Sequence, residues 1–262
     1  MKIIDTHCHL NDDAYTSDLD KVILRAKEAG ITHVFNNGDS LPSFSKILSL
    51  QERYPSFCFS VLGIHPEFAS ESDTYFEEAY QFIRDHKDSI SAIGEIGLDY
   101  HYSKDPAYVE NQKRRFIEQI KLAKELNLPI VIHSRDADYD TLEIIKQTLP
   151  PKLDLHCFSG SYEILRQYLL LPIEVHIGIG GVCTFKNARV IKEVIENSDI
   201  SIFLTETDCP YLAPVPYRGN RNEPSYLKNI IEQIATLKDL TVEECATILY
   251  ENGRKFYDLP RE

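Results

Sequence analysis

Residues 1–10 read MKIIDTHCHL, and this stretch places a short β-rich run directly before an HxH motif. Ile3 and Ile4 are typical of a buried strand, and His7 and His9 follow at its end. Because side chains alternate along a strand, these two histidines are expected to point to the same side. The motif therefore indicates a pair of metal ligands, although an isolated HxH also fits two unrelated histidines.

The β-rich pattern of the first strand recurs along the chain. Such runs occur at residues 3–4, 31–35, 57–62, 90–93, 130–132, 153–155, 173–179 and 202–204, and they alternate with helical segments. One helix is expected over about 109–126, with Phe116 and Ile120 on its apolar face and its end before Pro129. About eight strand-helix repeats in 262 residues favour a closed parallel barrel. We predict an α/β fold, a TIM (β/α)8 barrel, with residues 1–262 as a single domain.

A cluster of glycines begins at the end of the seventh predicted strand. Gly178, Gly180 and Gly181 form the sequence IGIGG, which is expected to make a tight turn. No GxGxxG motif opens the first helix, so the sequence gives little support to a dinucleotide site.

The composition is that of a globular, acidic protein. Hydrophobic residues make up 43% and charged residues 26%, and the formal net charge is −13. This charge opposes tight binding to duplex nucleic acid, so any such contact should be local and should depend on bound divalent cations. The six scattered cysteines suggest reduced thiols, and neither a signal-peptide pattern nor an apolar run of about 20 residues is present. We expect a cytoplasmic protein that does not bind membranes.

Four further chemistry-bearing residues lie at the ends of later predicted strands. They are Glu95 in GEIGLDY, His133 in VIHSRD, His156 in LHCFSG and Asp208 in LTETDCP. The carboxyl ends of barrel strands meet at one rim, so these residues are expected to join His7 and His9. Nitrogen and oxygen ligands without sulfur suit zinc, manganese, iron or magnesium.

Six ligands suggest two divalent metal ions. Glu95 is placed to bridge the ions. His7, His9 and Asp208 are expected to face one of them, and His133 and His156 the other.

Several segments, taken in order, closely resemble the TatD family of metal-dependent deoxyribonucleases within the amidohydrolase superfamily. They are DTHCHL, GIHP, GEIGLDY, HSRDA, HCFSG and ETDCPYLAPVPYRGNRNEP. The resemblance implies a TIM-barrel hydrolase whose metal ligands are His7, His9, Glu95, His133, His156 and Asp208. It also implies phosphodiester hydrolysis, with single-stranded DNA digested from 3′ to 5′. Ile96, where the family often has Thr, and the tail ENGRKFYDL depart from the usual pattern and leave the substrate preference open.

Roles for individual residues follow from this hypothesis. Asp208 is expected to act as the general base beside the attacking water, with Glu95 as the second catalytic carboxylate. Glu206 would either orient a ligand histidine or pair with an arginine. The expected substrate contacts are His65, Arg135, Arg218 and Arg221, although each of the arginines also fits an ordinary solvated charge.

Residues next to the proposed ligands have simpler interpretations. His101 would approach the site or be an ordinary loop histidine. Cys8, Cys157 and Cys209 are expected to point away from the ligands as buried packing residues, because neighbouring side chains alternate in a strand.

Three alternatives to a deoxyribonuclease remain. One is a hydrolase that opens a cyclic amide or lactone, although such enzymes often bridge their metals with a carbamylated lysine where this chain has Glu95. Another acts on a different ester, such as D-aminoacyl-tRNA. The third is a barrel without catalysis that serves only in binding.

Overall fold

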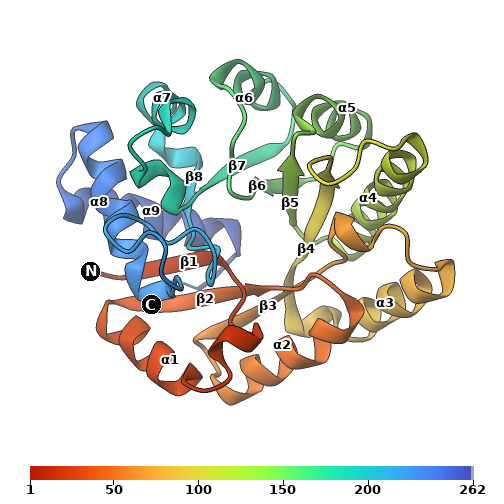
Figure 1. The fold of residues 1–262 in the computed structure, drawn as a ribbon, viewed down its shortest axis with the longest axis horizontal. Coiled ribbons are helices and arrows are strands. Elements are labelled where there is room, and N and C mark those ends of the chain that lie inside the picture. The colour runs from red at the N-terminus through yellow and green to blue at the C-terminus, as the bar shows by residue number, and fades with distance from the viewer. Residues whose placement is uncertain (261–262) are drawn as a thin grey trace.

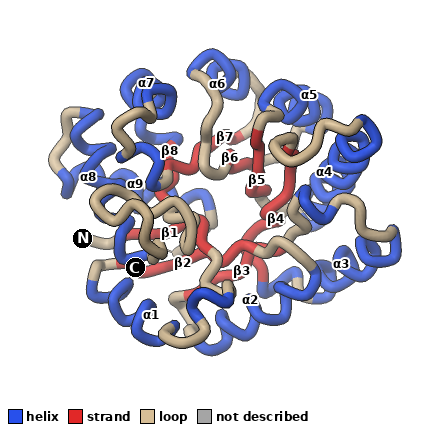
Figure 2. The backbone as a smooth tube through the Cα atoms, in the orientation of Figure 1, coloured by secondary structure: helices blue, strands red, loops and turns tan. Residues whose placement is uncertain are grey.

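The backbone of residues 1–260 is described here from a computed structural model of the chain. In this range eight strands form one sheet in the order β1 to β8, and every neighbouring pair is parallel. The strands are β1 (Ile3–Cys8), β2 (Ile31–Asn37), β3 (Cys58–Leu62), β4 (Ile90–Asp99), β5 (Ile130–Arg135), β6 (Lys152–Leu155), β7 (Glu174–Ile179) and β8 (Phe203–Thr205). The predicted TIM barrel is confirmed, and Figures 1 and 2 show its strands as an inner ring surrounded by helices.

The helices pack around the outside of this ring. They are α1 (Leu19–Glu28), α2 (Leu41–Arg53), α3 (Asp73–Asp85), α4 (Pro106–Leu126), α5 (Asp138–Thr148), α6 (Tyr162–Leu169), α7 (Arg189–Asn197), α8 (Leu227–Lys238) and α9 (Val242–Phe256). Short 3-10 helices lie at η1 (Asp13–Tyr15), η2 (Pro66–Phe68), η3 (Lys87–Ser89), η4 (Gly181–Thr184), η5 (Ile200–Ile202) and η6 (Pro224–Tyr226). No helix within residues 1–260 combines the length and the apolar character that crossing a membrane requires.

Most strands continue past the apolar runs that predicted them. The sequence pattern ended the fourth strand at residue 93, whereas β4 runs on through Glu95 to Asp99. Strand ladders are backbone hydrogen bonds and do not require apolar side chains, so polar residues extend the strands into the rim. Helix α4 ends at Leu126 as predicted but begins at Pro106, because the side chain of Asp105 caps its first turn.

The seam between β8 and β1 closes the barrel with few ladder bonds. A single parallel bridge joins Cys8 and Cys209. The hydroxyl of Thr6 donates to the carbonyl of Thr205 over 3.1 Å, and the hydroxyl of Thr205 donates to the carbonyl of Ile4 over 3.2 Å. Side-chain hydrogen bonds thus supplement the ladder where β8 is short.

The interior of the barrel is divided between an apolar part and a polar part. The apolar part contains Ile4, Phe35, Val61, Ala92, Val131 and Leu204, together with Phe256, Tyr257 and Leu259 from the end of the chain. The Tyr257 ring stacks on Phe35 with centroids 3.5 Å apart, and its hydroxyl donates to the carbonyl of Thr6. The C-terminal segment therefore fills the barrel below the rim that carries the polar residues.

Candidate functional site

The strand ends gather the six predicted metal ligands at one end of the barrel. A cavity of about 570 Å³ opens there, and its lining includes His9, Glu95, His133, His156 and Asp208. His7 lies beneath this lining and is fully buried. Strands β1, β4, β5, β6 and β8 supply or lead directly into these residues. The arrangement follows from parallel strands, whose carboxyl ends all meet at the same rim.

The carboxylate of Glu95 lies between two groups of histidines. Its Oε2 atom is 3.4 Å from His7 Nε2 and 3.8 Å from His9 Nε2. Its Oε1 atom is 2.7 Å from His133 Nδ1 and 3.7 Å from His156 Nε2. Each oxygen of one carboxylate therefore faces a different pair of these four imidazoles.

Asp208 reaches the same cluster from the loop that follows β8. Its Oδ1 atom is 3.4 Å from His9 Nε2, 3.8 Å from His156 Nε2 and 3.9 Å from His7 Nε2. The Nε2 atoms of His7 and His9 are 3.1 Å apart, as expected for two side chains on one face. The rings of His7 and His156 stack with centroids 3.4 Å apart. Asp208 thus lies closest to His9, with His156 and His7 slightly farther away.

The protonation of the cluster reflects its burial. Burial alone would raise the pKa of Glu95, but the facing imidazoles outweigh it and hold the pKa well below its ordinary value. Burial lowers the pKa of His7. Burial would also lower the pKa of His9, but the hydrogen-bonded carboxylate of Asp208 raises it to about 9. Protons on imidazoles thus balance the buried carboxylates, and binding of a cation at such a site displaces protons.

The donor set fits divalent metal ions. Four groups of three potential ligand atoms lie within 4.8 Å of one another. These groups are His7, His9 and Glu95; His65, Glu95 and His133; His156, Cys157 and Asp208; and His7, His156 and Glu206. In addition, the Nδ1 atom of His7 is buried and has no hydrogen-bond partner among the described residues. Imidazole nitrogens and carboxylate oxygens in this density are the ligands that zinc and related ions prefer.

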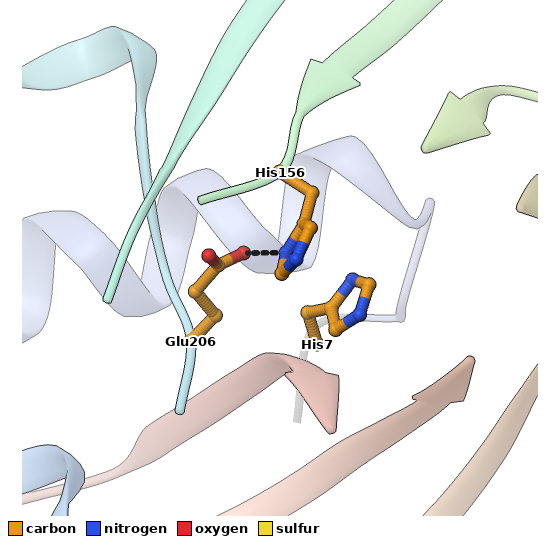
Figure 3. Close-up of side chains that lie close together, drawn as sticks. All are labelled: His7, His156 and Glu206. Atoms are coloured by element: carbon orange, nitrogen blue, oxygen red, sulfur yellow. Dashed lines mark hydrogen bonds and ion pairs between the residues drawn. The ribbon is translucent and has the colours of Figure 1, made fainter. Parts of the chain in front are cut away.

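Glu206 contacts a histidine and not an arginine. Its carboxylate is fully buried, and Oε2 accepts a hydrogen bond from His156 Nδ1 over 3.0 Å, as Figure 3 shows. The other oxygen accepts from the backbone N–H of Cys157 over 2.7 Å. Of the two interpretations of Glu206, the structure fits the one in which it orients the His156 ring.

A glycine in β7 makes room for the Glu206 carboxylate. Gly178 lies within the strand and not in the tight turn expected from the sequence, because β7 continues to Ile179. A Cβ atom at residue 178 would overlap the Oε2 atom of Glu206. Gly178 therefore leaves the space in which the Glu206 carboxylate can bind and orient the His156 ring.

Gly178→Ala should displace the Glu206 carboxylate and release the His156 ring. We expect metal affinity or activity to fall by about 10- to 100-fold, the usual effect of losing a residue that orients a ligand histidine. Gly180→Ala is the matched control, since a Cβ there would lie 3.6 Å from the nearest Glu206 atom. Metal titration of both variants, with circular dichroism to verify folding, would contradict the assignment if Gly178→Ala bound metal like the control.

Asp99 is a site residue that the sequence pattern did not predict. Its Oδ2 atom lies 3.1 Å from His133 Nε2, and it lines the cavity although almost fully buried. Burial alone would lower the pKa of His133, but hydrogen bonds that its ring donates to Asp99 and Glu95 raise it to about 9. Residues two apart in a strand lie on the same face, so Glu95, Gly97 and Asp99 share one face of β4. Strand periodicity could therefore have predicted Asp99.

Two buried glutamines of α4 bind the backbone of rim segments. The side chain of Gln112 accepts from the N–H of Asp99 over 2.8 Å and donates to its carbonyl over 2.9 Å. Gln119 does the same at Ile64, with distances of 2.8 and 3.0 Å. Ile64 directly precedes His65. One outer helix therefore fixes two segments that carry cavity residues.

The residues predicted to contact substrate divide into two groups. His65 and Arg135 line the cavity, and His65 Nε2 is 3.9 Å from Glu95 Oε1. Arg218 and Arg221 do not line it. Arg221 pairs with both oxygens of Asp18 at 2.7 Å, and the Arg218 guanidinium packs over the ring of Phe185 at 4.3 Å.

The loop after β8 explains why the two arginines lie elsewhere. Arg221 also donates to the carbonyl of Ala14 and packs over Tyr15. These contacts draw this part of the loop toward η1 and α1 and not into the cavity. His101, in the loop after β4, faces Asp136 with an Nδ1 to Oδ2 distance of 3.4 Å.

The three cysteines beside the ligands differ from one another. Cys8 and Cys209 are buried, as predicted for packing residues. Cys157 instead lines the cavity. Strand β6 ends at Leu155, and Cys157 has a φ of 45°, so strand alternation no longer holds at this residue. The expectation that Cys157 points away from the site was therefore wrong.

The barrel and its rim of histidines and carboxylates are those of a metal-dependent hydrolase, and comparisons with known proteins agree. The TatD related DNase family matches residues 4–258, so the chain belongs to this family, and the resemblance inferred from the sequence is confirmed. The uncharacterized metal-dependent hydrolase YabD of Bacillus subtilis is 41% identical over 259 residues, which cover 97% of this chain and 98% of YabD.

Two further proteins are similar over all or nearly all of their length. The 3′-5′ ssDNA/RNA exonuclease TatD of Pantoea vagans is 32% identical over 263 residues, covering 98% of this chain and 100% of that protein. The crystal structure of YJJV, a TatD homolog from Escherichia coli K12, superposes with a TM-score of 0.91 at 29% identity, with 98% of each chain covered. The chain is thus a metal-dependent hydrolase of the TatD family.

Proposed function

We propose that this hydrolase is a metal-dependent phosphodiesterase that removes nucleotides from the 3′ end of single-stranded DNA. The observation that carries the proposal is Glu95, whose two carboxylate oxygens face separate pairs of histidines. A carboxylate in this position is suited to be shared by two cations, and paired cations are a common arrangement in nucleases and phosphatases. The exonuclease named among the relatives supports this choice of substrate.

The proposed ligands follow the division of the cluster. His7, His9 and Asp208 would hold one ion, His133 and His156 the other, and Glu95 would be shared. When bound, such ions lower the pKa of water and polarise a phosphoryl oxygen.

The side chains around the cluster supply the remaining parts of the reaction. Burial alone would raise the pKa of Asp208, but the hydrogen bond to His9 and neighbouring imidazoles lower it, so its carboxylate is ionised at neutral pH. Asp208 can therefore accept the proton of the attacking water at Oδ1 or Oδ2. Arg135 can bind a nonbridging phosphate oxygen. Burial lowers the pKa of His65 to about 4, so this imidazole is neutral and can donate a hydrogen bond to the leaving oxygen.

Restoring metal to the stripped protein tests the proposed function. We expect metal-free protein to be inactive and one or more of Zn²⁺, Mn²⁺ and Mg²⁺ to restore hydrolysis of single-stranded DNA. A 3′ label should appear first as a mononucleotide, whereas a 5′ label should give a ladder that shortens stepwise. Dihydroorotate and a lactone are assayed beside the DNA. Absence of nucleotide release with every ion, or hydrolysis of only the cyclic substrates, would refute the proposal.

A further inference from the structure

The cavity above the metal centre carries little positive charge for a site that would accept a polyanion. Among the described residues that line it, Arg135 is the only lysine or arginine. Six carboxylates line the same cavity: Asp12, Asp39, Glu67, Glu95, Asp99 and Asp208. Even with two divalent ions bound, the cavity lining offers few cationic phosphate contacts beyond the reacting centre, so interactions other than ion pairs must hold a nucleic acid there.

Two exposed tyrosines line this cavity. Tyr102 lies in the loop after β4 and is 66% exposed. Tyr211 lies in the loop after β8 and is 54% exposed. Ligand pockets are commonly lined by aromatic side chains, so these two exposed rings are candidates for contact with a ligand.

The two tyrosines lie on opposite sides of the cavity mouth. Strands β4 and β8 are four places apart in the ring of eight, and Figures 1 and 2 show them across the barrel from each other. The loops that follow these strands therefore approach the cavity from opposite walls. A chain that passes over the metal centre would run between the two rings.

Each ring also has a polar neighbour that defines what it can bind. The Arg135 guanidinium lies 5.5 Å from the centroid of the Tyr102 ring, and Arg135 Nη1 is 3.5 Å from the Tyr102 hydroxyl. An aromatic ring beside an arginine can hold a base and the phosphate attached to it. The rings of Tyr211 and His9 form a T-shaped pair with centroids 6.1 Å apart, and the Tyr211 hydroxyl donates to Asp12 over 3.2 Å.

We propose that Tyr102 and Tyr211 are base-stacking subsites that hold unpaired nucleobases on either side of the reacting phosphodiester, with Arg135 on a phosphate beside Tyr102. Stacking on aromatic rings is independent of base identity and requires bases that are not paired. The subsites would therefore explain how an acidic chain selects single strands with Arg135 as the one lysine or arginine among the described cavity-lining residues. This inference rests on the proposed phosphodiesterase function.

Oligonucleotides with and without bases test the subsites in the metal-loaded full-length protein. One substrate is an intact single strand, and the other carries abasic residues at its last two 3′ positions. We expect the wild type to show a KM about five-fold or more lower for the intact strand. Tyr102→Ala and Tyr211→Ala should each raise the KM for the intact strand by a similar factor and leave kcat nearly unchanged, because stacking is lost equally before and during the reaction.

The same variants should act on the abasic strand as the wild type does. Tyr102→Phe, which keeps the ring, should retain the low KM for the intact strand. Tyr139→Ala is the matched control, since Tyr139 is an exposed tyrosine of α5 that does not line the cavity. Unchanged KM values in both alanine variants, or equal increases for intact and abasic strands, would overturn the stacking proposal while leaving the phosphodiesterase function in place.

Failure of the phosphodiesterase function has a separate signature. If the wild type cleaves neither strand with any ion, the proposed function is wrong. Fluorescence anisotropy then measures binding of the same two labelled strands without turnover. Equal affinity of the wild type for both strands would overturn the stacking subsites as well, whereas preference for the intact strand that is lost in Tyr102→Ala would support them.

Discussion

Glu95→Gln is expected to lower the hydrolytic rate by more than about 100-fold. Loss of a residue that only orients a metal ligand typically costs about 10- to 100-fold, and Glu95 is proposed to bind the metals directly. Both oxygens of Glu95 face imidazoles, so the substitution changes the surroundings of all four histidines at once. The amide removes a negative charge that two cations would share and presents N–H groups where an acceptor is needed. Metal content and turnover, measured on the same preparation, should fall together.

Glu67→Gln is the control for this substitution. Glu67 lines the same cavity, but its carboxylate is half exposed, and Oε2 lies 3.7 Å from His65 Nδ1. It should keep its metal and most of its activity. If Glu95→Gln retained the metal content and turnover of the control, Glu95 would not be the shared ligand.

Asp208→Asn should separate proton transfer from metal binding. Asparagine keeps an oxygen near His9 but cannot accept a proton as a carboxylate does, so we expect turnover to fall by about 10²- to 10⁴-fold with metal retained at least in part. Asp39→Asn, at another carboxylate of the cavity lining, should remain active. The measurement is the single-turnover rate on single-stranded DNA with bound metal quantified. Turnover equal to that of the wild type would remove Asp208 from the role of base.

The proposed ligands could be predicted from sequence because they depend on periodic structure. His7 and His9 alternate with Cys8, and the later ligands lie where parallel strands end, so one barrel brings them together. The same reasoning would have predicted Asp99 if the fourth strand had been extended beyond its apolar run. Strand position is a property of the backbone and is largely independent of distant side chains.

The residues that sequence placed less well depend on the paths of loops. Arg218 and Arg221 follow β8, where residues that bind substrate at the rim are expected. An ion pair with Asp18, however, holds Arg221 near the first helix. That contact joins residues from opposite ends of the chain, and no local pattern indicates it. Cys157 was misplaced because its left-handed backbone breaks the alternation of β6 one residue after His156.

The two glutamines of α4 have a consequence for how this barrel can change. Gln112 and Gln119 each pair with one backbone amide and one carbonyl, as a neighbouring strand would. The anchors of two rim segments are thus set from the outside of the barrel, independently of the loops that connect them. We therefore expect that loop residues beyond Asp99 and His65 can be exchanged while the reacting centre keeps its shape.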